Sequence, residues 1–225
     1  MVGKTNVAGT KLFAAIGVTY PEGSVLTCTK GTKTLTARTS TGQWVFAVPE
    51  PGTWTVTESS KNRGKSVTIT AEGQFESVNL KTFEILNPEV NIITGWETDA
   101  HNTCSVTPGT NDIVMYYYSS GAVNAWAMAN TSNIIEFGDY TTIKCEVEQE
   151  GGSEKGPFQF RLATSTNMTN SGNKDVVAST LIGSGSGVYS LPIGSLEQAY
   201  LRFTAYGIAT APSATLTDKR IWLED

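Results

Sequence analysis

Hydrophobic and polar residues alternate along most of this chain, in short runs separated by turn residues. The clearest example is residues 42–56, with the sequence GQWVFAVPEPGTWTV, which contains two such runs. The apolar side of the first run holds Trp44, Phe46 and Val48, and that of the second holds Trp54 and Val56. A period of two, filled by aromatic and β-branched residues, predicts half-buried β-strands. Pro49, Pro51 and Gly52 end the pattern between the runs, because proline cannot donate to a strand ladder and both residue types favour turns.

The rest of the first third predicts strands that close a sandwich over these two runs. Further strands are expected at residues 14–20, 24–30, 32–39, 65–71 and 75–81. Turn signals separate them, among them Pro21-Glu22-Gly23 and the hairpin signal at residues 30–32. About seven strands, spaced about 8–12 residues apart, predict a sandwich of immunoglobulin size.

A domain boundary is expected near residue 84. Residues 83–90, FEILNPEV, read as a short junction in which Pro88 interrupts the pattern, and the composition turns acidic there. We therefore expect one domain at residues 1–84 and a second at residues 85–225.

The second domain also alternates throughout. Strands are expected at residues 91–97, 112–119, 122–129, 134–137, 141–150, 157–164, 176–182, 187–193, 199–208 and 215–224. No helical period extends beyond a turn or two, and Gly, Asn and Ser turns are frequent, which predicts a sandwich or jelly roll. The last strand, with Leu216 and Ile221, is expected beside the first. The predicted fold class is all-β: an immunoglobulin-like β-sandwich followed by a jelly-roll β-sandwich.

Composition and charge narrow the classes of function. Only 16% of the 225 residues are charged, and the formal net charge is −5. Residues 1–82 hold nine Lys and Arg against five Asp and Glu, a charge of +4, whereas residues 83–225 hold seven against sixteen, a charge of −9. An acidic second domain, and a first domain without a basic run, argue against nucleic-acid binding.

Membrane insertion is also not expected. No apolar run approaches the roughly 20 residues of a membrane helix. The opening MVGKTNVAGTKLF lacks the continuous apolar core of a signal peptide. We expect a virion or extracellular location, reached by lysis, by assembly into a particle, or with a signal that this sequence lacks.

Three widely spaced cysteines, Cys28, Cys104 and Cys145, do not form the pattern of a disulfide framework. Small buried thiols are the favoured interpretation. A bridge between Cys104 and Cys145 stays open as the alternative, because both belong to the second domain.

Few residues suggest bond-making chemistry. The single histidine, His101, precedes Cys104 by three residues in a turn-like segment, DAHNTC. A nucleophile–base pair is conceivable there, but a solvated loop histidine is the more ordinary interpretation. The GSGSG stretch at residues 183–187 has glycine where a GxSxG nucleophile elbow needs serine. The expectation is therefore a protein that is not an enzyme.

No cofactor and no metal centre are expected, since His101 and Cys104 are too few ligands for a closed zinc site. A structural calcium ion is a weaker possibility near the ends of the second domain. Its candidate oxygen ligands are Asp99, Asp112, Glu224 and Asp225.

Aromatic residues are the more useful signal in the second domain. The candidates for glycan binding are Trp96, Tyr116, Tyr118, Trp126 and Tyr140. Side chains alternate along a strand, so Tyr116 and Tyr118 must face opposite to Tyr117, and one set lies outside the core. An exposed aromatic set indicates either a ligand surface, on which sugar rings can stack, or a subunit interface.

The segment GQWVFAVPEPGTWTVTESSKNRGKSVTITAEGQFESVNL resembles carboxypeptidase-regulatory-like and collagen-adhesin B-type domains. The shared pattern is Gly-x-aromatic-x-Phe, then Pro-Gly-aromatic-x-Val, then a hairpin ending in x-Val-x-Leu, and the resemblance covers about residues 14–82. It implies spacing, display and interaction. Some adhesin domains carry a Lys–Asn isopeptide bond assisted by a buried Glu, and the matching positions here are Lys11, Asn79 and Glu58.

The second domain resembles galactose-binding-like jelly rolls. The phrases FGDYTTIKCEVEQ, GVYSLPIGSLEQAYLRFTAYG and TLTDKRIWLE carry this resemblance, which covers residues 90–225. Such jelly rolls occur in carbohydrate-binding modules and in bacteriophage tail and baseplate proteins. The combination with the first domain resembles a prophage structural protein.

These resemblances imply a non-enzymatic virion component that displays the second domain for host-surface glycan binding or assembly. Its partners would be other virion proteins or copies of itself, together with a host-surface glycan. The alternative is a bacterial surface or secreted carbohydrate-binding adhesin module.

Overall fold

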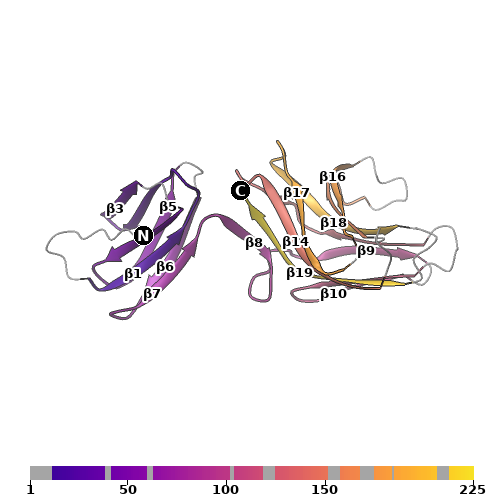
Figure 1. Cartoon of the computed structure of the whole chain (residues 1–225), viewed down its shortest axis with the longest axis horizontal. Coiled ribbons are helices and arrows are strands. Elements are labelled where there is room, and N and C mark those ends of the chain that lie inside the picture. The colour runs from indigo at the N-terminus through magenta and orange to yellow at the C-terminus, as the bar shows by residue number, and fades with distance from the viewer. Residues whose placement is uncertain are drawn as a thin grey trace. The chain divides into compact units, whose positions relative to one another are not determined.

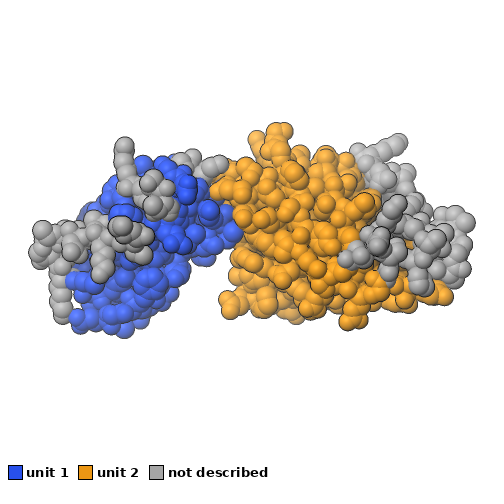
Figure 2. Space-filling model, in the orientation of Figure 1, with its two compact units in different colours: residues 1–82 blue, residues 83–225 orange. Residues whose placement is uncertain are grey.

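The computed structural model describes residues 12–38, 42–59, 63–101, 104–118, 125–151, 158–167, 175–183, 185–206 and 213–225. All regular structure in these ranges is β-strand, so the predicted all-β class is confirmed. The chain divides into two compact units, residues 1–82 and 83–225 (Figure 2). None of the described ranges contains a helix long and apolar enough to cross a membrane.

The first unit is a sandwich of two sheets (Figure 1). The three-stranded sheet has the order β4 (Gln43–Val48), β1 (Ala14–Thr19), β7 (Phe75–Asn79). The four-stranded sheet has the order β3 (Lys33–Arg38), β2 (Val25–Lys30), β5 (Gly52–Glu58), β6 (Arg63–Ile69). The seven strands match the predicted count, and the only parallel pair among their described ladders is β1 with β7.

The two aromatic runs of residues 42–56 lie in different sheets. β4 pairs with β1 in one sheet, whereas β5 pairs with β2 and β6 in the other. The break at residues 49–51 therefore carries the chain across the sandwich, and Phe46 and Trp54 meet in its buried core. The indole Nε1 of Trp54 donates to the carbonyl of Glu50 at 3.2 Å, which satisfies the polar edge of a fully buried ring.

Gly52 sits at this crossing with a φ of +129°, a conformation that side chains disfavour. A Cβ added there would lie 2.6 Å from Cε of Lys30. We expect Gly52→Ala to lower the free energy of unfolding by about 1 kcal/mol, because both the backbone and Lys30 would be strained. Urea unfolding followed by tryptophan fluorescence measures this change. Gly73→Ala, which changes another positive-φ glycine with open space around it, separates the backbone cost from the clash with Lys30.

Glu50, in the same segment between β4 and β5, forms ion pairs with two lysines. Nζ of Lys30 lies 2.8 Å from one carboxylate oxygen, and Nζ of Lys33 contacts the other. Hydrogen bonds from Lys30 and Lys33 lower the pKa of Glu50 from 4.5 to about 2. The resulting stabilisation is present above pH 4.5 and is lost as the pH falls through about 2.

An NMR titration of the Glu50 carboxyl carbon is therefore expected to show this group still ionised at pH 4, and Lys33→Met should raise its midpoint. An ordinary midpoint in the unchanged protein would contradict the two-lysine geometry.

The second unit contains two six-stranded sheets. The sheet we call the β19 sheet has the order β10 (Ser105–Pro108), β11 (Ile113–Tyr117), β19 (Ala214–Glu224), β14 (Thr142–Gly151), β17 (Gly187–Pro192), and β8 (Thr82–Leu86) also pairs with β19. The β18 sheet has the order β16 (Val176–Leu181), β15 (Phe158–Ala163), β18 (Gln198–Tyr206), β12 (Trp126–Thr131), β9 (Trp96–His101), and β13 (Ile135–Glu136) also pairs with β18.

Eight of these strands have jelly-roll connectivity. Four, in the order β11-β19-β14-β17, face four in the order β12-β18-β15-β16, and the chain crosses between the sheets at nearly every step. Both sheets contribute to one core, in which the rings of Phe160 and Phe203 stack at 4.9 Å. The expected pairing of the last strand with a first strand at residues 91–97 is not observed, because β19 pairs with β8, whereas residues 96 and 97 belong to β9 in the other sheet.

The start of this unit differs from expectation. The supposed junction at residues 83–90 contributes most of β8, so the boundary falls at residue 82 instead of 84. Residues 92–95 of the expected first strand are not in a strand, and β9 instead includes the DAH segment that reads as a turn. β9 is an edge strand with an exposed, charged sequence, so it lacks the alternation by which buried strands are recognised.

The cysteines are all free and buried, which confirms the thiol interpretation and shows the alternative Cys104–Cys145 bridge to be wrong. Burial raises the pKa of Cys28 to about 12 and also raises the pKa of Cys104. The pKa of Cys145 rises further, again mainly through burial. Thiols in such surroundings stay protonated and unreactive.

One carboxyl group is fully buried in the β19 sheet. Asp218 is 0% exposed and lies opposite Ile113 and Val147, beside a β-bulge at Glu146 and Val147. Neither of its oxygens has a hydrogen bond of standard geometry, although the backbone N–H groups of Arg220 and Lys219 favour the charged form. Burial dominates and raises the pKa of Asp218 well above 3.8.

Candidate functional site

The outer face of the β18 sheet combines aromatic, charged and amide side chains. Along β15 and β18, Phe158, Phe160 and Phe203 point into the core, so the residues between them point away from it. Cross-strand register places the following residues on this outer face: Gln159 and Arg161 of β15, Tyr200, Arg202 and Thr204 of β18, Trp126, Met128 and Asn130 of β12, and Glu97, Asp99 and His101 of β9.

An aromatic stack stands at one end of this face. Trp126 and His101 are direct cross-strand neighbours on β12 and β9, and their rings stack with centroids 4.4 Å apart and an interplanar angle of 12°. The indole Nε1 of Trp126 donates to Oδ2 of Asp99 at 3.2 Å, which fixes the ring. His101 is exposed and Trp126 is partly exposed, so the stack presents an apolar aromatic surface to solvent beside a carboxylate.

Polar side chains occupy the middle of the face. The guanidinium of Arg161 donates from Nε to Oε1 of Gln159 at 2.8 Å, so the two side chains hold each other in place. Thr204 lies directly opposite Gln159 on one side and Met128 on the other. It is only 1% exposed, and its Oγ1 has no hydrogen-bond partner in the described part of the chain. A buried hydroxyl without a partner is rare in folded proteins and lowers stability, so Thr204 is an uncommon feature of the row that it forms with Gln159 and Met128.

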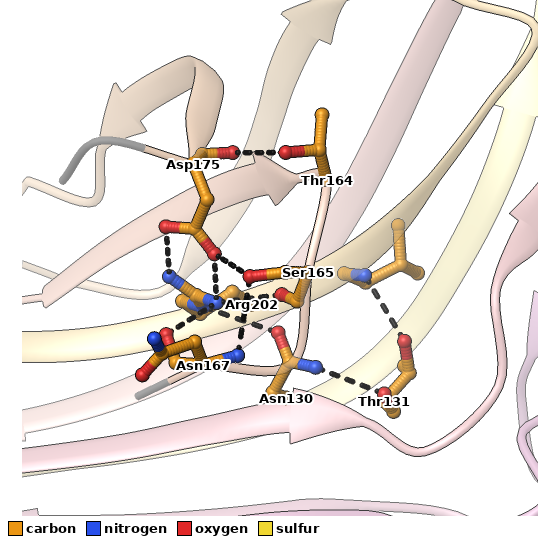
Figure 3. Close-up of polar contacts among 8 residues, drawn as sticks. Asn130, Thr131, Thr164, Ser165, Asn167, Asp175 and Arg202 are labelled. Atoms are coloured by element: carbon orange, nitrogen blue, oxygen red, sulfur yellow. Dashed lines mark hydrogen bonds and ion pairs between the residues drawn. The ribbon is translucent and has the colours of Figure 1, made fainter. Parts of the chain in front are cut away.

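Arg202 organises the other end of the face (Figure 3). Its Nε donates to Oδ1 of Asn130 at 3.1 Å, and its two terminal nitrogens donate to the two carboxylate oxygens of Asp175 at 3.1 and 2.9 Å. One terminal nitrogen also donates to the carbonyls of Ser165 and Asn167, at 2.9 and 3.2 Å. The guanidinium therefore joins β18 and β12 to the connection between β15 and β16.

The ion pair is well buried, since Arg202 is 1% exposed and Asp175 is 15% exposed. Burial alone would raise the pKa of Asp175, but hydrogen bonds from Arg202 and Ser165 outweigh it and lower this pKa below its ordinary value. Asp175 also accepts from Thr164, whose backbone N–H donates to the Asp175 carbonyl at 2.9 Å. Both described ends of the connection are thus fixed to the sheet.

The structure does not gather the five aromatic residues that the sequence suggested. Trp126 lies on the outer face of the β18 sheet, but Tyr116 is exposed by 37% on the outside of the β19 sheet, and Tyr117 is buried in the core as alternation requires. Trp96 packs on the core against Phe203, with ring centroids 6.2 Å apart.

The other two candidates lie outside strands. Tyr140 packs near Phe83, with ring centroids 6.4 Å apart. Tyr118 directly follows β11, and its carbonyl accepts from the thiol of Cys104 at 3.7 Å.

Two of the three isopeptide candidates lie in the described ranges, and they belong to different sheets. Glu58 is fully buried and lies opposite Arg63 at the β5–β6 ladder, in the four-stranded sheet. Asn79 is exposed on β7 of the other sheet, where its side chain bonds to Thr82 and to the Lys81 backbone. Lys11 lies outside the described residues.

His101 and Cys104 have separate surroundings. His101 stacks on Trp126 in the open, while Cys104 is a buried thiol with a raised pKa. This is not the arrangement of a nucleophile and its base.

The four candidate calcium ligands are also dispersed. Asp99 lies on β9, Asp112 precedes β11, and Glu224 pairs with Lys144 at the end of β19, next to Asp225. Within the described ranges, no group of three or more His, Cys, Asp or Glu could hold a metal ion.

Sequence reasoning did not identify Gln159, Arg161, Arg202 and Thr204. Their strands were predicted, and alternation against the phenylalanines would have assigned all four to one face. Asn130 and Asp175, in contrast, become neighbours of Arg202 only through the pairing of β12 with β18 and the return of the chain after β15.

No protein-family model matches the sequence, and a search of curated proteins gives no significant match. Among solved structures, a family 29 carbohydrate-binding module aligns with a TM-score of 0.38 and 10% identity over 63% of this chain and 89% of that chain. A xylan-binding module from Roseburia intestinalis aligns with a TM-score of 0.37 and 9% identity over 58% and 95%.

A third structure, of a carbohydrate-binding module from the β-sandwich superfamily, aligns with a TM-score of 0.38 and 16% identity over 89% and 85%. Likenesses this distant carry no argument about ligand or role.

Proposed function

We propose that this chain is a non-catalytic carbohydrate-binding protein, and that the outer face of the β18 sheet is its glycan-binding surface. The observation that carries this proposal is the aromatic stack of Trp126 and His101, which lies on the same side of the sheet as the fixed polar groups of Asp99, Gln159 and Arg161.

The chemistry of a sugar ring fits this arrangement. One side of a pyranose presents C–H groups, which pack against an aromatic plane, while its hydroxyls need donors and acceptors at the ring edge. The stack supplies the plane, and Asp99, Gln159 and Arg161 supply hydrogen-bonding groups already held by neighbours, so little side-chain entropy is lost on binding. The acidic second unit disfavours nucleic acid as the occupant of the same face.

The setting of this module is a further part of the proposal. Sequence resemblance supports a phage or prophage tail or baseplate component that binds host-surface glycans and assembles with other virion proteins or with copies of itself. The alternative is a bacterial surface or secreted adhesin module, and glycan binding on the outer face serves that setting equally well. In both settings the location would be extracellular or on a particle, and many copies would raise a weak affinity by avidity.

A glycan array probed with the full chain tests the proposal. We expect binding to a defined set of oligosaccharides, followed by calorimetry with the best ligand. Light scattering of the same sample distinguishes the settings, because a stable trimer or hexamer favours the particle and a monomer favours a free module. Absence of binding on plant, bacterial and host glycan panels would contradict the proposal.

A further inference from the structure

Five oxygen atoms converge on the side chain of Arg202. They are Oδ1 of Asn130, both carboxylate oxygens of Asp175, and the carbonyl oxygens of Ser165 and Asn167, all between 2.9 and 3.2 Å from guanidinium nitrogens. We call this set the oxygen cage. Carboxylate, amide and carbonyl oxygens of this kind also surround bound hard cations in proteins, so the cage is built for a positive charge.

The cage joins three segments of the chain at one point, and Thr164 and Ser165 also donate to Asp175 there. Asn130 belongs to β12, Ser165 and Asn167 follow β15, and Asp175 precedes β16 (Figure 3). Without the guanidinium, a largely buried carboxylate and two carbonyls would lose a charged partner, which is strongly unfavourable. Arg202 therefore links the connection to β12, while Thr164 and Ser165 link the two described ends of the connection to each other.

This connection borders the proposed binding surface. Arg161 is the direct cross-strand neighbour of Arg202 and holds Gln159, and both lie on the outer face that the connection adjoins at β15. A shift of the chain at Thr164–Asn167 would alter the end of β15 that carries Arg161.

We propose that Arg202 is a positioning residue, acting as a tethered cation that fills the oxygen cage and fixes the edge of the glycan-binding surface. The inference rests on the proposed function for its consequence in binding, whereas the cage itself is independent of any ligand. Because the charge is part of the chain, the surface is formed without a dissociable ion.

Chemical rescue of Arg202→Ala in the full chain tests this proposal. The variant should melt at a lower temperature and bind the array-identified glycan at least tenfold more weakly. Low millimolar guanidinium chloride, far below its denaturing range, should raise both the melting temperature and the affinity, whereas sodium chloride at equal ionic strength should not. Arg202→Lys should resemble the alanine variant, because a single ammonium cannot reach all five oxygens.

Arg220→Ala is the matched control. Arg220 also pairs with a carboxylate, Glu84, but on the other sheet and with 38% of its side chain exposed, so guanidinium should restore nothing there. If Arg202→Ala binds glycan as tightly as the unchanged protein, or if guanidinium acts on both variants alike, the proposal is wrong.

A milder variant covers the case in which Arg202→Ala does not fold. Asp175→Asn keeps the shape of the side chain and removes the charge, and it should speed hydrogen exchange at the amide of Thr164, which donates to the Asp175 carbonyl. Unchanged exchange would contradict the cage. If guanidinium rescues melting while the unchanged protein binds no glycan, the cage stands and the proposed function fails.

Discussion

Replacement of Trp126 by alanine is expected to weaken glycan binding about thirtyfold, a loss of about 2 kcal/mol. The indole forms the larger part of the aromatic surface and is held by Asp99 and His101, so its removal takes away the plane on which a sugar ring would pack. Calorimetry with the best array ligand measures the change. Trp126→Phe should keep part of the affinity, because it keeps an aromatic ring and loses only the hydrogen bond to Asp99.

Tyr116→Ala is the control for this prediction. Tyr116 is another exposed aromatic residue of the same unit, but it lies on the outside of the β19 sheet, on a different face from Trp126. Its removal should leave the affinity unchanged. Equal losses in the two variants would move the binding surface away from the outer face of the β18 sheet.

Asp218→Asn is expected to stabilise the second unit by about 2 kcal/mol at pH 7, although most substitutions of buried residues destabilise. The carboxyl of Asp218 is fully buried without a standard hydrogen bond, and Asp112 and Glu146 add repulsion when it ionises. Asparagine has nearly the same shape and cannot ionise. Chemical denaturation of the two proteins at several pH values measures the difference.

The stability of the second unit should fall with rising pH through the titration of Asp218. The pKa of Asp218 is raised in the folded protein, so its favourable contribution is complete below about 3.8 and is lost as the pH rises through the raised value. The advantage of Asp218→Asn should therefore grow with pH over that range.

Asp175 provides the opposite case, because Arg202 lowers its pKa and its contribution is lost as the pH falls. Asp175→Asn should accordingly destabilise at pH 7, and a matching gain in both variants would contradict the assignments.

Alternation in the sequence is sufficient to predict most strands, because a strand with one buried face and one solvent-exposed face requires apolar and polar residues to alternate. Residues 141–150 and 157–164 are the clearest examples, and both became strands close to their predicted bounds. Alternation does not predict β9, because an edge strand with Glu97, Asp99 and His101 buries too little to impose that pattern.

The candidate site depended on information that alternation does not contain. Its residue type makes Trp126 a candidate, but its partners His101 and Asp99 are fixed by the pairing of β12 with β9. Trp96 is a candidate for the same reason, yet it packs on the core. Residue type alone does not separate these two tryptophans, since only the register of neighbouring strands decides which face each ring occupies.

The place of β19 has a consequence for how the second unit is made. β19 lies between β11 and β14 and also pairs with β8. These three strands precede β19 by long stretches of chain, and each lacks one of its pairing partners until β19 has been synthesised. A ribosome must therefore release the segment at residues 214–224 before that sheet can close, and a nascent chain shorter than this exposes unpaired strand edges that chaperones would have to cover.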